Sequence, residues 1–395
     1  MNRADVEALL LEVVTEIALD LDAAMVAAYG LRSPVSLDVV ALGKGATAMV
    51  ERVPEARDAL VVLPDGAPVP SRPSCARVLR AGHPLPDVRS VEAGVAALDR
   101  AHHGAADEVC VLVSGGSSSL AFAPIDGVTL EDARAVFDAL LRSGASVRAM
   151  NVVRRHLSRL HGGGLVEGLR RGATVFVMSD VIGGAAHDVG SGPASTDPTT
   201  VDDARAVLRR YAPSFASIPL RETLKEAPAP GRFVEMIVAE PSRLSAVLAE
   251  RLRRTGYATR ILAPSVADVD AMAREYVALA RALPARAAVV RSAEPSLIVP
   301  PGTGAGGRCS HLAALVARDL PRGVTFSAIA SDGVDGASGT AGAVVSATSF
   351  PDRALLDRAL ATFDTGPLHR AAGTALTAGP TGLNLADVHA LIRAG

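Results

Sequence analysis

The feature that most constrains the fold of this chain is a short buried strand that breaks directly into a loop of small residues. Val109–Val113 is an uninterrupted apolar run, and the loop follows it at once. Glycine has no Cβ and serine adds hydroxyl donors, so such a loop lets an anion approach backbone N–H groups closely. It matches neither a Walker A sequence nor the dinucleotide-binding GxGxxG pattern. An ordinary connecting turn is the alternative to an anion site. The candidate anion-binding residues are Ser114, Gly115, Gly116, Ser117 and Ser118.

The same arrangement of strand, small-residue turn and helix recurs along the chain. Leu37–Leu42 runs into Gly43-Lys44-Gly45 at the head of a helix, where free N–H groups and the positive end of the helix dipole favour an anion. Val324–Ala330 ends in a polar turn in the same way. We therefore assign the chain to the α/β class.

Apolar periodicity and turn residues predict further elements. Expected strands are 59–63, 173–178, 234–239, 258–262 and 297–299. Expected helices are 4–29, 88–103, 128–141, 200–211, 241–255, 267–283 and 309–318. The turn at 379–384 is expected to cap the last helix.

Length and composition bound the architecture and the partners. A chain of 395 residues is long for one hydrophobic core, so two domains are expected, and the Pro/Ala run Ala227–Gly231 divides them into 1–230 and 231–395. The net charge of −2 gives no electrostatic reason for nucleic-acid or membrane partners, and no apolar run approaches the ~20 residues of a membrane span. The amphipathic start resembles no signal peptide, so we expect a cytoplasmic protein. Cys75, Cys110 and Cys309 lack metal-ligand spacing and indicate reduced, incidental thiols.

Lysine is scarce in this chain. Of the 40 basic residues, only Lys44 and Lys225 are lysine. A retained lysine is a candidate for a position that needs a compact ammonium, which a planar guanidinium does not imitate. Lys225 lies in a polar segment and indicates a solvated face, whereas Lys44 lies in the first glycine turn. We therefore predict that Lys44 binds an anion, with a surface lysine as the alternative.

Two carboxylates follow expected strands directly, Asp180 after Ala173–Met178 and Asp332 after Val324–Ala330. Ligands collect at the carboxyl ends of strands in open parallel sheets. We therefore predict both aspartates as magnesium ligands, and Asp180 also as a base.

Other polar residues fall in small-residue turns or beside arginine pairs. His83 is fixed between a glycine and a proline, although a lone histidine is more often structural than catalytic. The adjacent Arg154 and Arg155 lie near Asn151 and are suited to bind a carboxylate or phosphate bidentately, although surface arginines are common here. The further binding candidates are His83, Asn151, Arg154, Asp188 and Ser191.

Nine collinear segments between about residues 40 and 390 resemble the glycerate 2-kinase family with a C-terminal MOFRL domain. They are Gly43-Lys44-Gly45, Gly82-His83-Pro84, Ser114-Gly115-Gly116, residues 151–158, Ser179-Asp180-Val181, Ser191-Gly192-Pro193, Gly306-Gly307-Arg308, residues 332–336 and residues 379–382.

The resemblance implies a two-domain α/β protein with an N-terminal Rossmann-like domain, a C-terminal MOFRL-like domain and an active site in the cleft between them. The implied activity is ATP- and Mg²⁺-dependent phosphorylation of D-glycerate, with Lys44 and Arg308 as the cationic residues and Asp180 as the third catalytic group. Such chemistry needs charges that hold the transferring phosphoryl group. A small hydroxylated substrate is the expected partner, and a homodimer is allowed for.

The chain departs from the family pattern within its motifs. The altered positions are Gly184, Ser292, Ala293, Ala305, Cys309, Ser310, His311, Gly339 and Ala386. A changed substrate and a lost activity both account for this, and we favour a changed substrate because the cationic and acidic residues persist. D-Glycerate is then expected to be a poor acceptor. The alternative is a non-catalytic protein that binds a nucleotide or small ligand. The absence of GxGxxG after the first strand disfavours an oxidoreductase.

Overall fold

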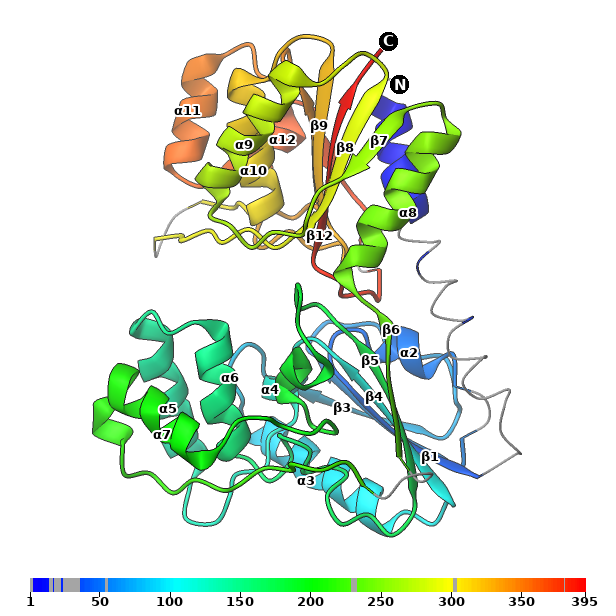
Figure 1. Cartoon of the computed structure of the whole chain (residues 1–395), viewed down its shortest axis with the longest axis vertical. Helices are drawn as coiled ribbons and strands as arrows, with labels where there is room; N and C mark the ends of the chain where they lie inside the picture. The colour runs from blue at the N-terminus through cyan, green and yellow to red at the C-terminus, as the bar shows by residue number, and fades with distance from the viewer. Residues whose placement is uncertain are drawn as a thin grey trace. The chain divides into compact units, whose positions relative to one another are not determined.

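The computed structural model describes residues 3–13, 17, 23, 36–53, 56–228, 233–300, 304–379 and 381–395. The chain divides into two compact α/β units (Figure 1). Leu21–Val238 form the first-sheet unit, and Met1–Asp20 together with Ala239–Gly395 form the second-sheet unit. The α/β class and the two-domain organisation are therefore confirmed.

The first sheet has six strands, and the neighbours among its first five pair in parallel. Their order across the sheet is β3 (Ala76–Ala81), β2 (Asp58–Pro64), β1 (Leu37–Leu42), β4 (Glu108–Ser114), β5 (Gly172–Met178) and β6 (Phe233–Ala239). The chain leaves β1 towards β2 and β3, then crosses back to β4 and β5 on the other side. The strand order therefore reverses between β1 and β4, where open α/β sheets bind their ligands.

Helices of the first-sheet unit bury two apolar clusters. Helix α3 packs on the strands, while α5, α6 and α7 pack on one another around Phe122, Phe137 and Leu208. Thr129, Ser146 and Thr200 cap these three helices by accepting backbone N–H groups. The helices are α2 (Ala46–Val50), α3 (Val88–His103), α4 (Ser117–Leu120), α5 (Leu130–Arg142), α6 (Val147–His156), η1 (Ala186–Ser191), α7 (Val201–Tyr211) and η2 (Pro213–Phe215).

The second sheet is mixed, because only β7 and β8 pair in parallel and the other neighbours are antiparallel. Its order is β11 (Ala375–Leu376), β10 (Gly342–Ser346), β9 (Val324–Ala330), β12 (Asp387–Arg393), β8 (Ala287–Ala293) and β7 (Ala258–Ile261). Figure 1 shows α8 and the helical residues 3–13 on one side of the sheet, and α9, α10, α11 and α12 on the opposite side. The helices are α8 (Pro241–Arg254), α9 (Val269–Ala282), α10 (Arg308–Asp319), α11 (Arg353–Ala361) and α12 (Thr365–Ala371).

Several expected elements differ from the structure. Strand β6 follows the predicted linker but hydrogen-bonds in the first sheet, so the units divide at 238/239 and not at 230/231. Residues 297–299 are not a strand; the neighbouring strand is Ala287–Ala293, whose many alanines weaken the apolar signal. The turn at 379–384 caps no helix and leads into β12. Of the expected helix 4–29, residues 14–16, 18–22 and 24–29 lie outside the described residues, as does part of the linker.

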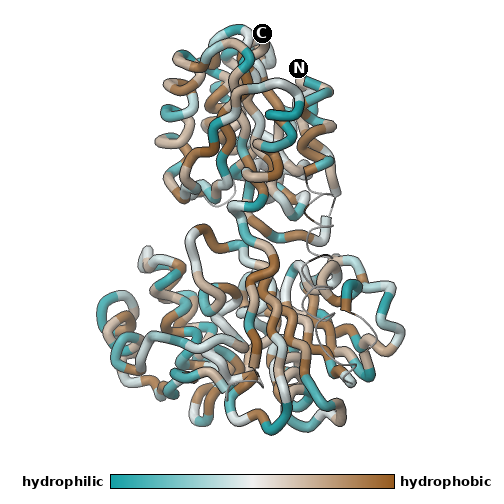
Figure 2. Tube along the Cα trace, turned by 45° about the vertical axis from the view of Figure 1, so that its right-hand side comes forward, coloured by the Kyte–Doolittle hydropathy of each residue, from teal (hydrophilic) through white to brown (hydrophobic). Residues whose placement is uncertain are grey.

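Hydrophobic residues follow the strands of both sheets, and hydrophilic residues follow the outer helices and loops (Figure 2). No described helix combines the length and the hydropathy needed to span a membrane.

Candidate active site

Four of the predicted turns lie at the same edge of the first sheet, because each follows the carboxyl end of a parallel strand. Lys44 follows β1, His83 follows β3, the loop 114–118 follows β4 and Asp180 follows β5. These segments are far apart in sequence, and the parallel register alone brings them to one edge.

Two hydrogen bonds join the turn after β1 to the turn after β4. The Lys44 backbone N–H donates to the Gly115 carbonyl at 2.9 Å, and the Gly45 N–H donates to Ser114 Oγ at 2.9 Å. Gly43 has φ +117°, and a Cβ there would lie 2.3 Å from Ser114 Oγ, so only glycine fits. The turn that carries Lys44 is therefore fixed to the Gly/Ser loop at the point where the strand order reverses.

Gly116 brings Lys44 and His83 together. It has φ +86°, and a Cβ there would lie 3.2 Å from the His83 ring and 3.4 Å from Lys44 Cγ. The Lys44 side chain is half-buried, and the His83 side chain is exposed. Loss of hydration on the inner side of the ring and the charges of Lys44 and Arg154 lower the pKa of His83 to about 4. His83 is therefore a neutral hydrogen-bonding group at pH 7.

A polar cluster from α6 and η1 extends this site. Arg154 Nη1 and Ser191 Oγ both donate to Asn151 Oδ1, at 3.3 and 3.2 Å. Arg154 lies over the Phe137 ring at 5.2 Å, which orients its guanidinium. Because the charge of Arg154 reaches His83, the cluster lies near the Lys44 turn.

Ser117 is fully buried beneath Gly190, and within the described residues its hydroxyl has no hydrogen-bond partner. A buried hydroxyl without a partner costs about 1–3 kcal/mol, so it is a group that a water or ligand atom would satisfy.

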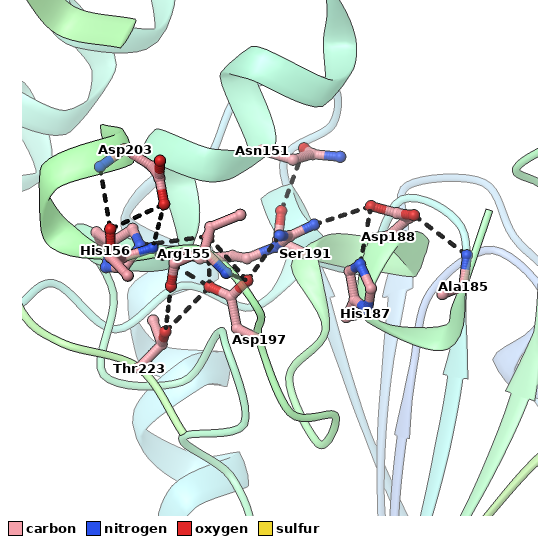
Figure 3. Close-up of polar contacts among 12 residues, drawn as sticks. Asn151, Arg155, His156, Ala185, His187, Asp188, Ser191, Asp197, Asp203 and Thr223 are labelled. Carbon is pink, nitrogen blue, oxygen red and sulfur yellow. Dashed lines mark hydrogen bonds and ion pairs between the residues drawn. The ribbon is translucent and has the colours of Figure 1, made fainter. Parts of the chain in front are cut away.

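Asp188 lies in a buried ion network (Figure 3). Arg155 is 2% exposed and donates to Asp188 Oδ1 at 3.0 Å and to Asp197 Oδ1 at 2.9 Å. Asp197 also accepts the Thr223 hydroxyl at 3.0 Å. The hydrogen bond between Arg155 and Asp188 holds η1 against α6, and Ser191 is thereby positioned beside Asn151.

Asp180 is half-buried at the tip of β5 and follows Ser179, whose hydroxyl accepts the Val181 N–H at 3.2 Å. In the second-sheet unit, Asp332 is also half-buried and accepts the Val334 N–H at 3.0 Å. Both aspartates therefore lie at strand tips as expected, each in a different unit.

Arg308 begins α10 and is held by two carboxylates of its own unit. Its Nε and Nη2 donate to the Asp387 carboxylate at 2.7 and 3.1 Å, and its Nη1 donates to Glu294 at 3.0 Å. Burial raises the pKa of Asp387 to about 6, although Arg308 opposes the shift. Sequence reasoning missed this clamp, because Asp387 lies in a strand that it did not predict.

The altered residues after Arg308 face the interior of the second-sheet unit. Cys309 and Ser310 are fully buried, and His311 stacks on Phe363 with ring centroids 5.1 Å apart. Asp335 accepts the N–H groups of Cys309 and Ser310, both at 2.8 Å, and so caps α10. These side chains pack inside the unit.

Two family models and several relatives match this chain. A model described as a domain of unknown function, DUF4147, matches residues 1–224, and the MOFRL family model matches residues 287–387. A D-glycerate 2-kinase of Thermotoga maritima is 31% identical over 79% of this chain and 78% of its own. This chain belongs to the glycerate 2-kinase family.

Other relatives agree on the fold and differ in name. The crystal structure of a glycerate kinase from Thermotoga maritima matches this glycerate 2-kinase family member with a TM-score of 0.85 and 26% identity, over 99% of this chain and 100% of that one. An Agrobacterium vitis protein, named provisionally as a hydroxypyruvate reductase, is 34% identical over 90% of this chain and 86% of its own. The predicted resemblance to the glycerate 2-kinase family and the predicted two-domain α/β fold are therefore confirmed.

A pH dependence of stability follows from His161 of this family member. Burial, with the charges of Arg154 and Arg155, lowers the pKa of His161 to about 3 from its ordinary 6.5. Below pH 6.5 His161 binds a proton in the unfolded chain but not in the folded chain. The free energy of unfolding therefore decreases by about 1.4 kcal/mol for each unit by which the pH is lowered. Urea unfolding between pH 7 and 4 should show a smaller slope for His161→Leu, and an unchanged slope would contradict this.

Proposed function

We propose that this protein is an ATP- and Mg²⁺-dependent kinase that phosphorylates a hydroxyl group of a small glycerate-like acid. The observation that carries the proposal is the junction between the Lys44 turn and the Gly/Ser loop, at the reversal of strand order. An ammonium and a loop of small residues at that point suit an anion of several oxygens.

The residues fit a phosphate group on two counts. Gly116, with φ +86°, leaves open the space that a Cβ would fill at 3.2 Å from the His83 ring and 3.4 Å from Lys44 Cγ, and within the described residues the buried Ser117 hydroxyl has no hydrogen-bond partner. Lys44 would stabilise the negative charge on the transferring phosphoryl group, a contact typically worth 10²–10³ in rate. Arg154, oriented by Asn151 and Phe137, would bind the carboxylate of the acceptor.

Asp180 offers a half-buried carboxylate oxygen of the kind that Mg²⁺ takes as a ligand, and it is also the candidate acceptor for the hydroxyl proton. Asp332 offers the same kind of oxygen within the second-sheet unit, where it remains a predicted ligand. When bound, Mg²⁺ supplies positive charge to phosphate oxygens. Arg308, whose guanidinium orientation is set by Asp387 and Glu294, remains the predicted phosphate-binding cation of the second-sheet unit.

D-Glycerate is the first acceptor to test. The departures beside Arg308 suggested another acceptor, but Cys309 and Ser310 are buried in their own unit. These two side chains therefore give no direct contact that would favour a new acceptor, and the half-buried altered positions Gly184 and Ala305 carry the alternative of a changed acceptor. We therefore expect D-glycerate to be used within about tenfold of the best acceptor in kcat/KM, which corresponds to about 1.4 kcal/mol.

A coupled ADP-release assay tests the proposal with D-glycerate, L-glycerate, other hydroxy acids, sugar acids and polyols. We expect turnover that needs both ATP and Mg²⁺ and stops with EDTA. Binding of ATP–Mg²⁺ in a thermal-shift assay without ADP release from any acceptor would instead support a non-catalytic binding protein. Because one relative is named as a reductase, hydroxypyruvate with NADH or NADPH completes the panel. Oxidation of the cofactor without kinase turnover would overturn the proposal.

A further inference from the structure

Three side chains with metal-ligating atoms meet inside the second-sheet unit. Each of Cys309, Asp387 and His389 offers one ligand atom, and the three atoms lie within 4.8 Å of one another. Asp387 and His389 are two residues apart on β12, so they share one face of the strand. Cys309 lies in the first turn of α10, which packs over the neighbouring strands β9 and β10.

The histidine of this cluster is arranged as a metal ligand. His389 is fully buried, and within the described residues its Nε2 has no hydrogen-bond partner. Its Nδ1 lies 3.0 Å from the Tyr276 hydroxyl oxygen. Histidines that bind metals through one nitrogen usually donate the other N–H to an oxygen, which fixes the ring. In the tautomer that carries its proton on Nδ1, Tyr276 accepts that N–H and Nε2 is available to a metal ion.

The local charges leave room for a cation. Asp387 and Glu294 share the single positive charge of Arg308. Asp335, which is 1% exposed, adds a further carboxylate, although helix N–H groups satisfy it. Arg291 is the partner of His389 in the β8–β12 register, lies over the Tyr276 ring and is itself paired with Glu275 at 2.7 Å. The set formed by Arg308, Asp387 and Glu294 therefore has one negative charge in excess.

We propose that Cys309, Asp387 and His389 form a binding site for Zn²⁺ or a closely related transition-metal ion. This inference does not rest on the proposed function and concerns an ion distinct from Mg²⁺. A thiolate and an imidazole select zinc-type ions, whereas Mg²⁺ takes oxygen ligands. Under this proposal Cys309 would be a metal ligand, whereas the sequence alone indicates an incidental thiol.

Charges and protons balance when Zn²⁺ binds to these three side chains. The Cys309 thiol loses its proton to solvent as the sulfur–zinc bond forms, Nε2 of His389 donates a lone pair, and one Asp387 oxygen binds while keeping its hydrogen bond to Arg308. Two positive charges enter and one proton leaves, so the net charge of −1 becomes zero. Ligand atoms around tetrahedral zinc lie roughly 3.3–3.8 Å apart, so a closure of about 1 Å completes the site.

The zinc content of the purified protein tests the proposal directly. The full chain, produced with zinc in the medium and washed with EDTA, should retain about one zinc per chain by elemental analysis, because the ligands are buried. Cys309→Ser and His389→Gln should each retain less than about a tenth of that. Cys110→Ser is the matched control, since Cys110 is also a fully buried cysteine outside any disulfide but lies in the first sheet.

A second measurement keeps the test valid if a variant is unstable. Protein prepared with Co²⁺ should show a thiolate-to-cobalt charge-transfer band that Cys110→Ser keeps and Cys309→Ser loses. Wild-type protein that is folded by circular dichroism but holds less than about a tenth of an equivalent of zinc would overturn the proposal. Zinc retained unchanged by Cys309→Ser would overturn it as well.

Discussion

Replacing Lys44 with alanine is expected to lower kcat/KM for phosphoryl transfer by about 10²–10³, while the Tm of the protein stays within about 2 °C. The reason is that the side chain supplies one full charge at the Gly/Ser loop. The fold should persist because Lys44 anchors its turn through its backbone N–H, which alanine retains. Steady-state ADP release and thermal unfolding measure the two quantities.

Two variants control this experiment. Lys44→Arg should also lose activity, because a planar guanidinium does not reproduce a compact ammonium with three donors. Lys225→Ala removes the other lysine, whose ammonium donates to Thr223 Oγ1 at 2.7 Å and pairs with Glu222, away from the Lys44 turn. It should keep kcat/KM. Full activity in Lys44→Arg would contradict the inference that the chain retains a lysine at this position because it needs a compact ammonium.

Replacing Arg155 with methionine is expected to destabilise the first-sheet unit by about 3–5 kcal/mol. Arg155 is 2% exposed, and the substitution would leave Asp197, which is 1% exposed, without its guanidinium partner. An uncompensated buried carboxylate costs far more than a lost surface pair. Asp188 would also lose its contact with α6, so Ser191 should no longer be held beside Asn151 (Figure 3).

Urea unfolding at pH 7 measures this effect, with Arg148→Met as the matched control. Arg148 lies on the same helix α6 but is exposed, so its substitution should change the free energy of unfolding by less than about 0.5 kcal/mol. A cost below about 1 kcal/mol for Arg155→Met would contradict the account of a buried, charge-dependent network.

The sequence allowed the strands and turns of the first-sheet unit to be predicted well. Strand Leu37–Leu42 was predicted with its observed bounds, and the turns after β1, β4 and β5 lie at one edge as expected. This works because a buried parallel strand is a continuous apolar run, and the turn that follows it must be small. Lys44 stood out because 38 of the 40 basic residues are arginine and the other lysine, Lys225, lies in a polar segment.

Contacts between segments that lie far apart in the sequence could not be predicted. Arg308 was predicted as catalytic, but its clamp by Asp387 requires β12, whose sequence Asp-Val-His-Ala-Leu-Ile-Arg gives no clear strand signal. Cys309 and His389 lack ligand spacing along the chain and meet only because α10 packs over this sheet. Asp188 and Asp197 share Arg155 for the same reason: pairing across a fold leaves no local pattern.

The position of β12 has a consequence for synthesis on the ribosome. The first-sheet unit is continuous in sequence and can fold as it emerges, whereas the other unit combines residues 1–20 with residues after 238. In that unit β12 lies between β8 and β9, so both strands keep open edges until residues 387–393 have left the exit tunnel. Open edges recruit other strands. Nascent chains that stall before residue 387 should therefore bind ribosome-associated chaperones through the second-sheet unit, although their first-sheet unit is already folded.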